Sequence, residues 1–338
     1  MLKRISPLWL GIGISGSLLL LMFVIETMLG RWSELLVDGE FDPLARVSEG
    51  ILRDTRIAIV QCLLMGYLPA ALLHALRSGR RTVLMLQQAL DCTRQECESL
   101  ATSLRLSTRG LVIIGLAALA LSLVSPYLIP PAPESPWNPA TWEPEVVWHR
   151  ILGPLTMIWA WWLVYTIITV SIRLSRIAKT LTRIDLLDLS PLSPFTQQGL
   201  TNALLLIGSL SIWSLMMIET GFGQMMLIMG VSTLVSTSLA LLAPVYGVHR
   251  RICQSKEDAL VWVNGEIANQ LPGIRSTESG QAGGRMADLI AYRGMIEDIS
   301  EWPFTLSTYA RIALYLFLPV ATWGVGLVAE EIFGRLVF

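Results

Sequence analysis

Charged residues are scarce in this sequence. They make up 15% of 338 residues, and the formal net charge is −1. Soluble domains carry about 25% charged residues, and disordered chains are also rich in charge, so the composition excludes both classes. A nucleic-acid-binding protein needs a basic surface, so we expect no nucleic-acid partner. Four cysteines are too few for a disulfide scaffold.

Long apolar runs are abundant instead, and 53% of the residues are hydrophobic. A helix needs about 20 apolar residues to cross a bilayer. We predict an all-α, polytopic transmembrane bundle, with residues 1–338 forming one integral membrane domain in contact with lipid. Cytosolic helical extensions are expected at 80–107 and 250–300. The seven predicted membrane-spanning helices are approximately 8–29, 57–76, 111–129, 151–172, 200–218, 222–245 and 309–328.

The basic residues favour one orientation of this bundle. With the N-terminus in the cytoplasm, 19 of the 25 Lys and Arg residues fall on the cytoplasmic side of the seven segments. Because cytoplasmic loops carry the excess of Lys and Arg, we predict a cytoplasmic N-terminus and an outside C-terminus. Cys92, Cys97 and Cys253 would then face the cytoplasm, where thiols stay reduced.

A coiled-coil-like apolar stripe follows the second predicted helix. Its residues recur at a spacing of three to four, which places them on one side of a helix. We identify this stripe as the best candidate for a cytosolic partner surface. Its members are Val83, Leu86, Leu90, Cys97, Leu100 and Leu104.

Two further groups of residues are candidate sites. Glu26, Glu219, Glu330 and Glu331 lie at the predicted outer ends of helices, where they could form a cation-attracting vestibule or be ordinary interfacial charges. Trp159 and Trp162 share one face of the fourth helix, where they could line an apolar ligand cavity or pack against neighbours.

Catalytic and cofactor motifs are not convincing in this chain. Gly11, Gly13 and Gly16 match a dinucleotide fingerprint in letters, but they lie inside an apolar helix, where small residues permit close helix packing. The three histidines lie near segment ends, and the cysteines have no metal-ligand spacing. We therefore predict no enzyme, no catalytic residue, no cofactor and no metal site.

Two stretches resemble known sequences. Residues 183–195 (RIDLLDLSPLSPF) and 302–319 (WPFTLSTYARIALYLFLP) are similar to segments of uncharacterised bacterial multi-pass membrane proteins. This resemblance implies the bacterial cytoplasmic (inner) membrane. The predicted topology also resembles insect gustatory-receptor-like seven-helix channels, although Tyr315-Leu316 replaces the Gln-Phe expected after Thr308-Tyr309.

Three functions remain open from the sequence. The leading one is a non-enzymatic scaffold or a subunit of a membrane complex. The second is a homo-oligomeric ion channel or ligand-responsive receptor, with the last helix at the central axis. The third is a transporter of an apolar or weakly polar solute, which should contain an enclosed cavity near Trp159 and Trp162.

Overall fold

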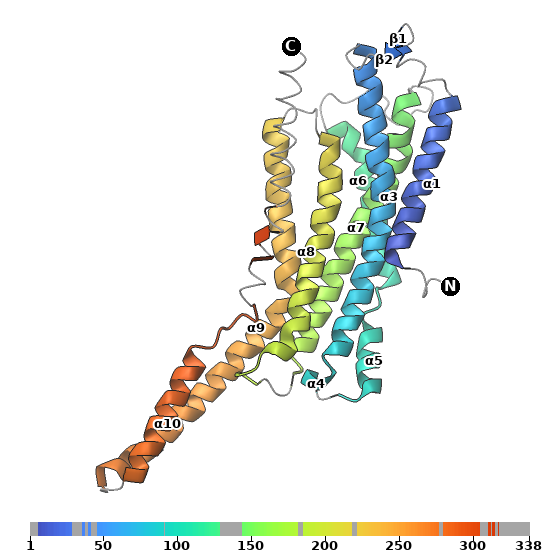
Figure 1. Ribbon diagram of the computed structural model, residues 1–338. Coiled ribbons are helices and arrows are strands. Elements are labelled where there is room, and N and C mark those ends of the chain that lie inside the picture. Colours follow the sequence, from blue (N-terminus) through green and yellow to red (C-terminus); the bar gives the residue numbers. More distant parts are fainter. Residues whose placement is uncertain are drawn as a thin grey trace.

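The computed structural model is a helical bundle with a helical arm at one end (Figure 1). It describes residues 6–28, 36–37, 40–41, 46–90, 92–128, 144–181, 185–217, 222–276, 280–304, 310–311, 313–314 and 317. The bundle contains α1 (Pro7–Met28), α3 (Arg46–Met85), α6 (Thr108–Leu128), α7 (Pro144–Ala178), α8 (Ser193–Ser214) and α9 (Phe222–Ser276). The other helices are α4 (Gln87–Leu90), α5 (Arg94–Ser103), η2 (Ser190–Leu192), η3 (Leu215–Met217) and α10 (Gly280–Glu297). A small antiparallel ribbon pairs β1 (Leu36–Val37) with β2 (Glu40–Phe41). The predicted all-α class is confirmed.

Four segments of the described chain are long and apolar enough to cross a membrane. They are Pro7–Met28, Thr55–Met85, Arg94–Val124 and Trp148–Ala178. These segments correspond to the first four predicted helices. The structure therefore supports a multi-pass membrane protein with four candidate spans, not seven.

The other three predicted spans are not among these four candidates, for separate reasons. The segment 200–218 lies in α8 and η3, and Gln197, Gln198 and Asn202 make the first half of α8 polar. The segment 222–245 forms the start of α9, where side chains are described only from Val231 onward. The segment 309–328 falls mostly outside the described residues. Even so, α8 contacts α3 and α9, and α9 contacts α7, so both helices run beside the spans (Figure 1).

Glycine permits the closest helix contacts in the bundle. A Cβ at Gly66 of α3 would overlap the carbonyl oxygen of Gly11 in α1 and would lie 2.9 Å from the backbone nitrogen of Ser15. Gly11 therefore does serve close packing, as its sequence context predicts. Around Gly13 and Gly16 of α1 the described residues leave open space.

Arginine side chains join the helix ends at the bottom of Figure 1 by donating hydrogen bonds to backbone carbonyl groups. Arg173 of α7 donates to the carbonyl oxygens of Ser103, the last residue of α5, and of Arg105 just beyond it. Arg251 of α9 donates to the carbonyl oxygen of Leu181, beyond the end of α7, at 3.1 Å. The last carbonyls of a helix have no partner within that helix, and cations stabilise them. These contacts hold α5, α7 and α9 together below the bundle.

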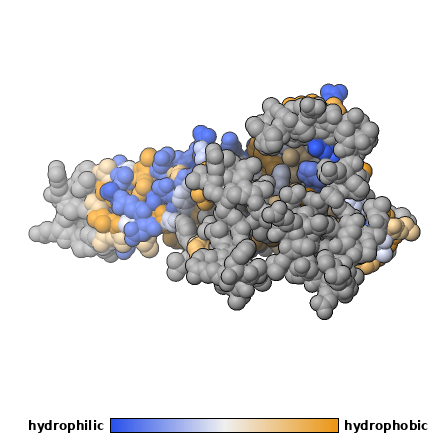
Figure 2. Space-filling view, turned by 90° about the horizontal axis from the view of Figure 1, so that it is seen from above, coloured by the Kyte–Doolittle hydropathy of each residue, from blue (hydrophilic) through white to orange (hydrophobic). Residues whose placement is uncertain are grey.

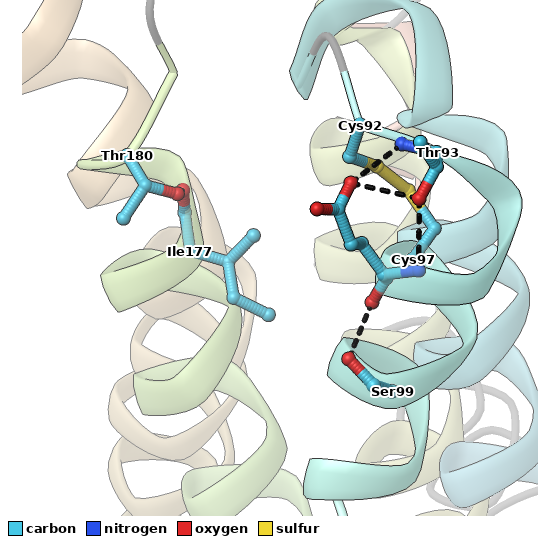
Figure 3. The surroundings of a disulfide bond; sticks show 7 residues. Cys92, Thr93, Cys97, Ser99, Ile177 and Thr180 are labelled. Atoms are coloured by element: carbon cyan, nitrogen blue, oxygen red, sulfur yellow. Dashed lines mark hydrogen bonds between the residues drawn. A yellow bond between two sulfur atoms is a disulfide. The ribbon is translucent and has the colours of Figure 1, made fainter.

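A capping box and a disulfide shape the start of α5 (Figure 3). Thr93 accepts a hydrogen bond from the backbone of Glu96, and the Glu96 carboxylate accepts from the backbone and hydroxyl of Thr93. Cys92 and Cys97 flank the cap with Cα atoms 6.1 Å apart and form a disulfide. The sequence predicts that these two thiols are reduced, whereas the structure joins them in a disulfide.

Candidate functional site

The predicted partner stripe is part of the chain's own core. Its apolar side chains pack against α7, the start of α8 and α9, around the fully buried Phe195. Leu100 is partly buried in the same cluster, and the other five members are buried: Val83, Leu86, Leu90, Cys97 and Leu104. The stripe therefore presents no exposed surface to a partner in this structure.

The two predicted cavity aromatics serve helix packing. The rings of Trp159 and Trp162 meet edge to face with centroids 5.1 Å apart. The Trp162 indole N–H donates to the carbonyl oxygen of Leu111 at 2.8 Å, and its ring lies against Gly115. Trp162 therefore joins α7 to α6. Trp159 packs against a cluster of buried apolar side chains that includes Leu64 of α3 and Leu163 of α7. Neither residue lines the two chambers described below.

Of the predicted vestibule carboxylates, only Glu26 lies within the described residues. It is buried near the end of α1. Glu219, Glu330 and Glu331 lie outside the described residues, so the vestibule stays a prediction.

Two neighbouring chambers lie between the helices of the bundle. The first, the polar chamber, has a volume of about 110 Å³, and its lining includes the polar side chains of Gln61, Ser122, His149, Arg150 and Thr156. The second, the apolar chamber, has a volume of about 400 Å³ and is mainly apolar. Leu64, Thr156, Met157 and Trp213 line both chambers, so the two lie side by side. A mainly apolar cavity with a few grouped polar side chains is typical of small-molecule sites.

The polar chamber contains an unpaired buried amide oxygen. Gln61 of α3 is 3% exposed, and its Nε2 lies 2.8 Å from Nδ1 of His149 at the start of α7. Its Oε1 is buried and has no hydrogen-bond partner among the described residues. A buried, unpaired polar atom costs about 1–3 kcal/mol, and the cost is recovered when a ligand supplies a donor.

Other buried amides in the bundle are fully connected, which makes Gln61 distinctive. Thr82 of α3 donates to Oε1 of Gln198 at 3.2 Å, and Nε2 of Gln198 donates to Oδ1 of Asn202 at 2.8 Å. Asn202 in turn donates to the hydroxyl of Ser171 in α7 at 3.1 Å. Such interhelical hydrogen bonds stabilise helix bundles in membranes by about 0.6 kcal/mol each on average.

The apolar chamber reaches the outside of the bundle. Its walls come from α3, α6, α7, α8 and α9, and they include leucines, methionine and tryptophan. Three wall residues, Leu121, Trp161 and Val164, are also exposed on the bundle surface. Its volume lies within the range of about 300–1,000 Å³ that ligand pockets occupy. A ligand could therefore enter from the surrounding lipid.

A second candidate site is the arm, formed by residues 252–276 of α9 and by α10. The arm projects sideways from the bundle, and Figure 2 shows hydrophilic and hydrophobic residues mixed on its surface. Val263 and Ile296 are fully buried in its core. Val261 is 72% exposed, however, and Trp262 is 60% exposed. Large apolar side chains on a projecting helix pair are typical of interaction surfaces.

No protein-family model, curated protein or solved structure matches this chain. The resemblances to bacterial membrane proteins and to gustatory-receptor-like channels therefore stay predictions. The function has to be argued from the geometry of the chain itself.

Sequence analysis missed the polar chamber. Gln61 carries a signal, because an amide in the middle of an apolar run is costly against lipid and indicates a buried partner. His149 and Arg150 carry little signal, since polar residues are common at the start of a membrane helix. Nothing in the sequence pairs Gln61 with a residue 88 positions away.

Proposed function

We propose that this chain is a non-enzymatic multi-pass membrane protein that binds a small, weakly polar amphiphile inside its helical bundle. The observation that carries the proposal is the unpaired Oε1 of Gln61 in the polar chamber, which lies beside an apolar chamber of about 400 Å³. Of the functions that the sequence leaves open, ligand reception and solute transport use such a cavity.

The lining defines the chemical class of the ligand. Gln61 Oε1 requires a donor, which a hydroxyl group supplies. The imidazole of His149 and the guanidinium of Arg150 add further hydrogen-bonding groups beside it. The apolar chamber accommodates an aliphatic or aromatic body. A fatty alcohol of medium length has both parts.

A photoreactive alcohol tests this proposal. We expect a decanol that carries an aliphatic diazirine to label the purified protein at Met157 or Trp213, read by mass spectrometry of peptides. Excess unlabelled decanol should compete. Gln61→Leu should weaken competition about tenfold, because a lost hydrogen bond of about 1.4 kcal/mol changes affinity by that factor. Ala160→Phe, which fills the apolar chamber, should abolish cavity labelling.

Ala120→Phe is the matched control, because Ala120 lies on the exposed surface of α6 and outside the cavity lining. It should leave labelling unchanged. The proposal is overturned if labelling spreads evenly over the lipid-facing helices, or if Ala160→Phe and Ala120→Phe behave alike.

We further propose that the end of the bundle that carries α4 and α5 faces the cytoplasm, in a bacterial cytoplasmic membrane, where the Cys92–Cys97 pair would be reduced. The last turns of α3 and α7 and the middle of α9 bring basic residues to this end, and cytoplasmic segments carry the Lys and Arg excess. These residues are Arg77, Arg80, Arg81, Arg173, Arg176, Lys179, Arg250 and Arg251.

Thiol accessibility tests this orientation. Cys253 is partly exposed at the base of the arm, whereas Cys62 is buried. A membrane-impermeant maleimide should leave Cys253 unlabelled in intact cells and should label it after permeabilisation. Val37→Cys, in the ribbon at the opposite end, should label in intact cells. Labelling of Cys253 without permeabilisation would reverse the orientation.

The arm favours a second candidate function, that of a subunit or scaffold in a membrane complex. The exposed Val261 and Trp262 of α9, together with Ile290 and Met295 of α10, support this function. A homo-oligomeric channel is one form of such a complex, in which the arm of one copy contacts another. A foreign subunit or defined oligomer in native mass spectrometry would support it, whatever the outcome of the alcohol experiment.

A further inference from the structure

Three potential metal ligands meet at the base of the arm. His249 and Cys253 are four residues apart on α9, so their side chains share one face of the helix. Glu301 lies beyond the C-terminus of α10 and returns to the same face. The ligand atoms of the three side chains all lie within 4.8 Å of one another.

The segment that carries Glu301 is held in place from two directions. Lys256 of α9 donates to the carbonyl oxygens of Glu297 at 2.8 Å and Ile299 at 3.0 Å, at the end of α10. On the other side, Thr196 of α8 donates to the carbonyl oxygen of Pro303 at 3.1 Å. Contacts of residues other than the three ligands therefore hold Glu301 beside α9.

The imidazole of His249 is oriented for coordination. It stacks on the indole of Trp302 with centroids 4.1 Å apart and planes 7° apart. Its Nδ1 lies 3.0 Å from the backbone oxygen of Glu301, so a proton on Nδ1 is donated there. That tautomer leaves the lone pair of Nε2 for a metal ion, which is the usual arrangement of metal-binding histidines.

The distances suit a small tetrahedral ion. Sγ of Cys253 lies 3.8 Å from Nε2 of His249. With Zn–N and Zn–S bonds of about 2.1 and 2.3 Å, tetrahedral ligands lie roughly 3.5 Å apart. The ligand atoms of the group lie up to 4.8 Å apart, and the exposed side chain of Glu301 can rotate to bring its carboxylate closer to the other two ligands. We propose that His249, Cys253 and Glu301 bind a divalent transition-metal ion of the zinc class, with one coordination position left open.

Local charge favours a cation at this position. The carboxylates of Glu301 and Glu257 lie near the Cys253 thiol and add negative charge there. A divalent cation compensates the same negative charge and stabilises the thiolate as a ligand. Imidazole, thiolate and carboxylate together select zinc over magnesium or calcium, which prefer oxygen ligands alone.

An ion at this position would cross-link two parts of the chain. His249 and Cys253 belong to α9 where it leaves the bundle, and Glu301 belongs to the segment that returns from α10. The site therefore lies across the base of the arm. Sequence analysis predicted no metal site because Glu301 is 52 residues from His249 and no spacing rule relates them. The His-x-x-x-Cys spacing of His249 and Cys253 was the one available signal.

The test uses the full chain in detergent, with Cys92 and Cys97 replaced by alanine so that thiols released by reduction of their disulfide cannot bind metal. After chelator treatment, zinc chloride should bind at one equivalent per chain, as measured by elemental mass spectrometry after gel filtration, and should raise the melting temperature. Cobalt chloride should give a sulfur-to-cobalt absorption band. Cys253→Ser should remove this band, and His249→Ala and Glu301→Gln should each weaken zinc binding at least tenfold.

His74→Ala is the matched control. His74 is exposed on α3 and does not belong to the ligand group. This variant should bind zinc as the parent does. Glu301→Gln changes an exposed side chain, so it remains interpretable even where His249→Ala fails to fold. The inference is overturned if the parent binds no zinc at micromolar concentration, or if Cys253→Ser and Glu301→Gln bind it unchanged.

Discussion

Replacing Gly247 with alanine is expected to lower the free energy of unfolding by about 1–3 kcal/mol. Gly247 lies in α9 where this helix touches α7. A Cβ there would overlap the carbonyl oxygen of Ser175 and would lie 2.6 Å from its hydroxyl and 2.8 Å from its Cα. Because the obstacle is mainly backbone, no side-chain rotation relieves it, and the two helices must move apart.

Gly265→Ala is the control on the same helix. Nothing in the described chain lies within 4 Å of the Cβ that it adds. Alanine has a better helix propensity than glycine by about 1 kcal/mol, so this variant should be slightly more stable. Unfolding of the detergent-solubilised protein, titrated with SDS and followed by tryptophan fluorescence, measures both. Effects of the same sign at the two positions would contradict the close α7–α9 contact.

The sequence was sufficient to predict the all-α class of this fold and its first four membrane-crossing helices. Apolar runs of about 20 residues located α1, α3, α6 and α7, because a bilayer requires that length. Periodicity also predicted helix beyond the second apolar run, where the structure has α4 and α5. The count of seven spans exceeded the four candidates in the described residues. In the fifth predicted span, polar residues such as Asn202 lower the hydropathy, and the length of an apolar run alone does not show this.

The candidate sites were less predictable, because each is assembled from distant segments. The cavity takes residues from five helices, and its significant feature is an oxygen of Gln61 that lacks a partner. Whether a buried amide is satisfied depends on which side chains the fold brings to it, as the contrast between Gln61 and Gln198 shows. Sequence periodicity identifies the buried face of a helix, and it does not identify what covers that face.

The apolar stripe after α3 is the clearest example of this limit, and it leads to the largest expected effect. Leu86 is 0% exposed and belongs to the cluster of buried side chains around Phe195, where it packs with residues of α7, α8 and α9. Leu86→Ala should therefore lower the free energy of unfolding by about 2–5 kcal/mol, because it removes buried methyl groups and leaves a cavity. Leu84→Ala, two residues earlier and 44% exposed, should change it by less than about 0.5 kcal/mol.

The same pair of variants separates the two interpretations of the stripe. If the stripe binds a partner, Leu86→Ala leaves the stability of the isolated chain unchanged and weakens a complex. If it packs within the chain, as the structure has it, the isolated chain loses stability and a complex is affected only through that loss. Denaturation of the purified monomer in detergent decides between them. Because the stripe is occupied internally, the exposed Val261 and Trp262 of the arm are then the more favourable place to look for a partner.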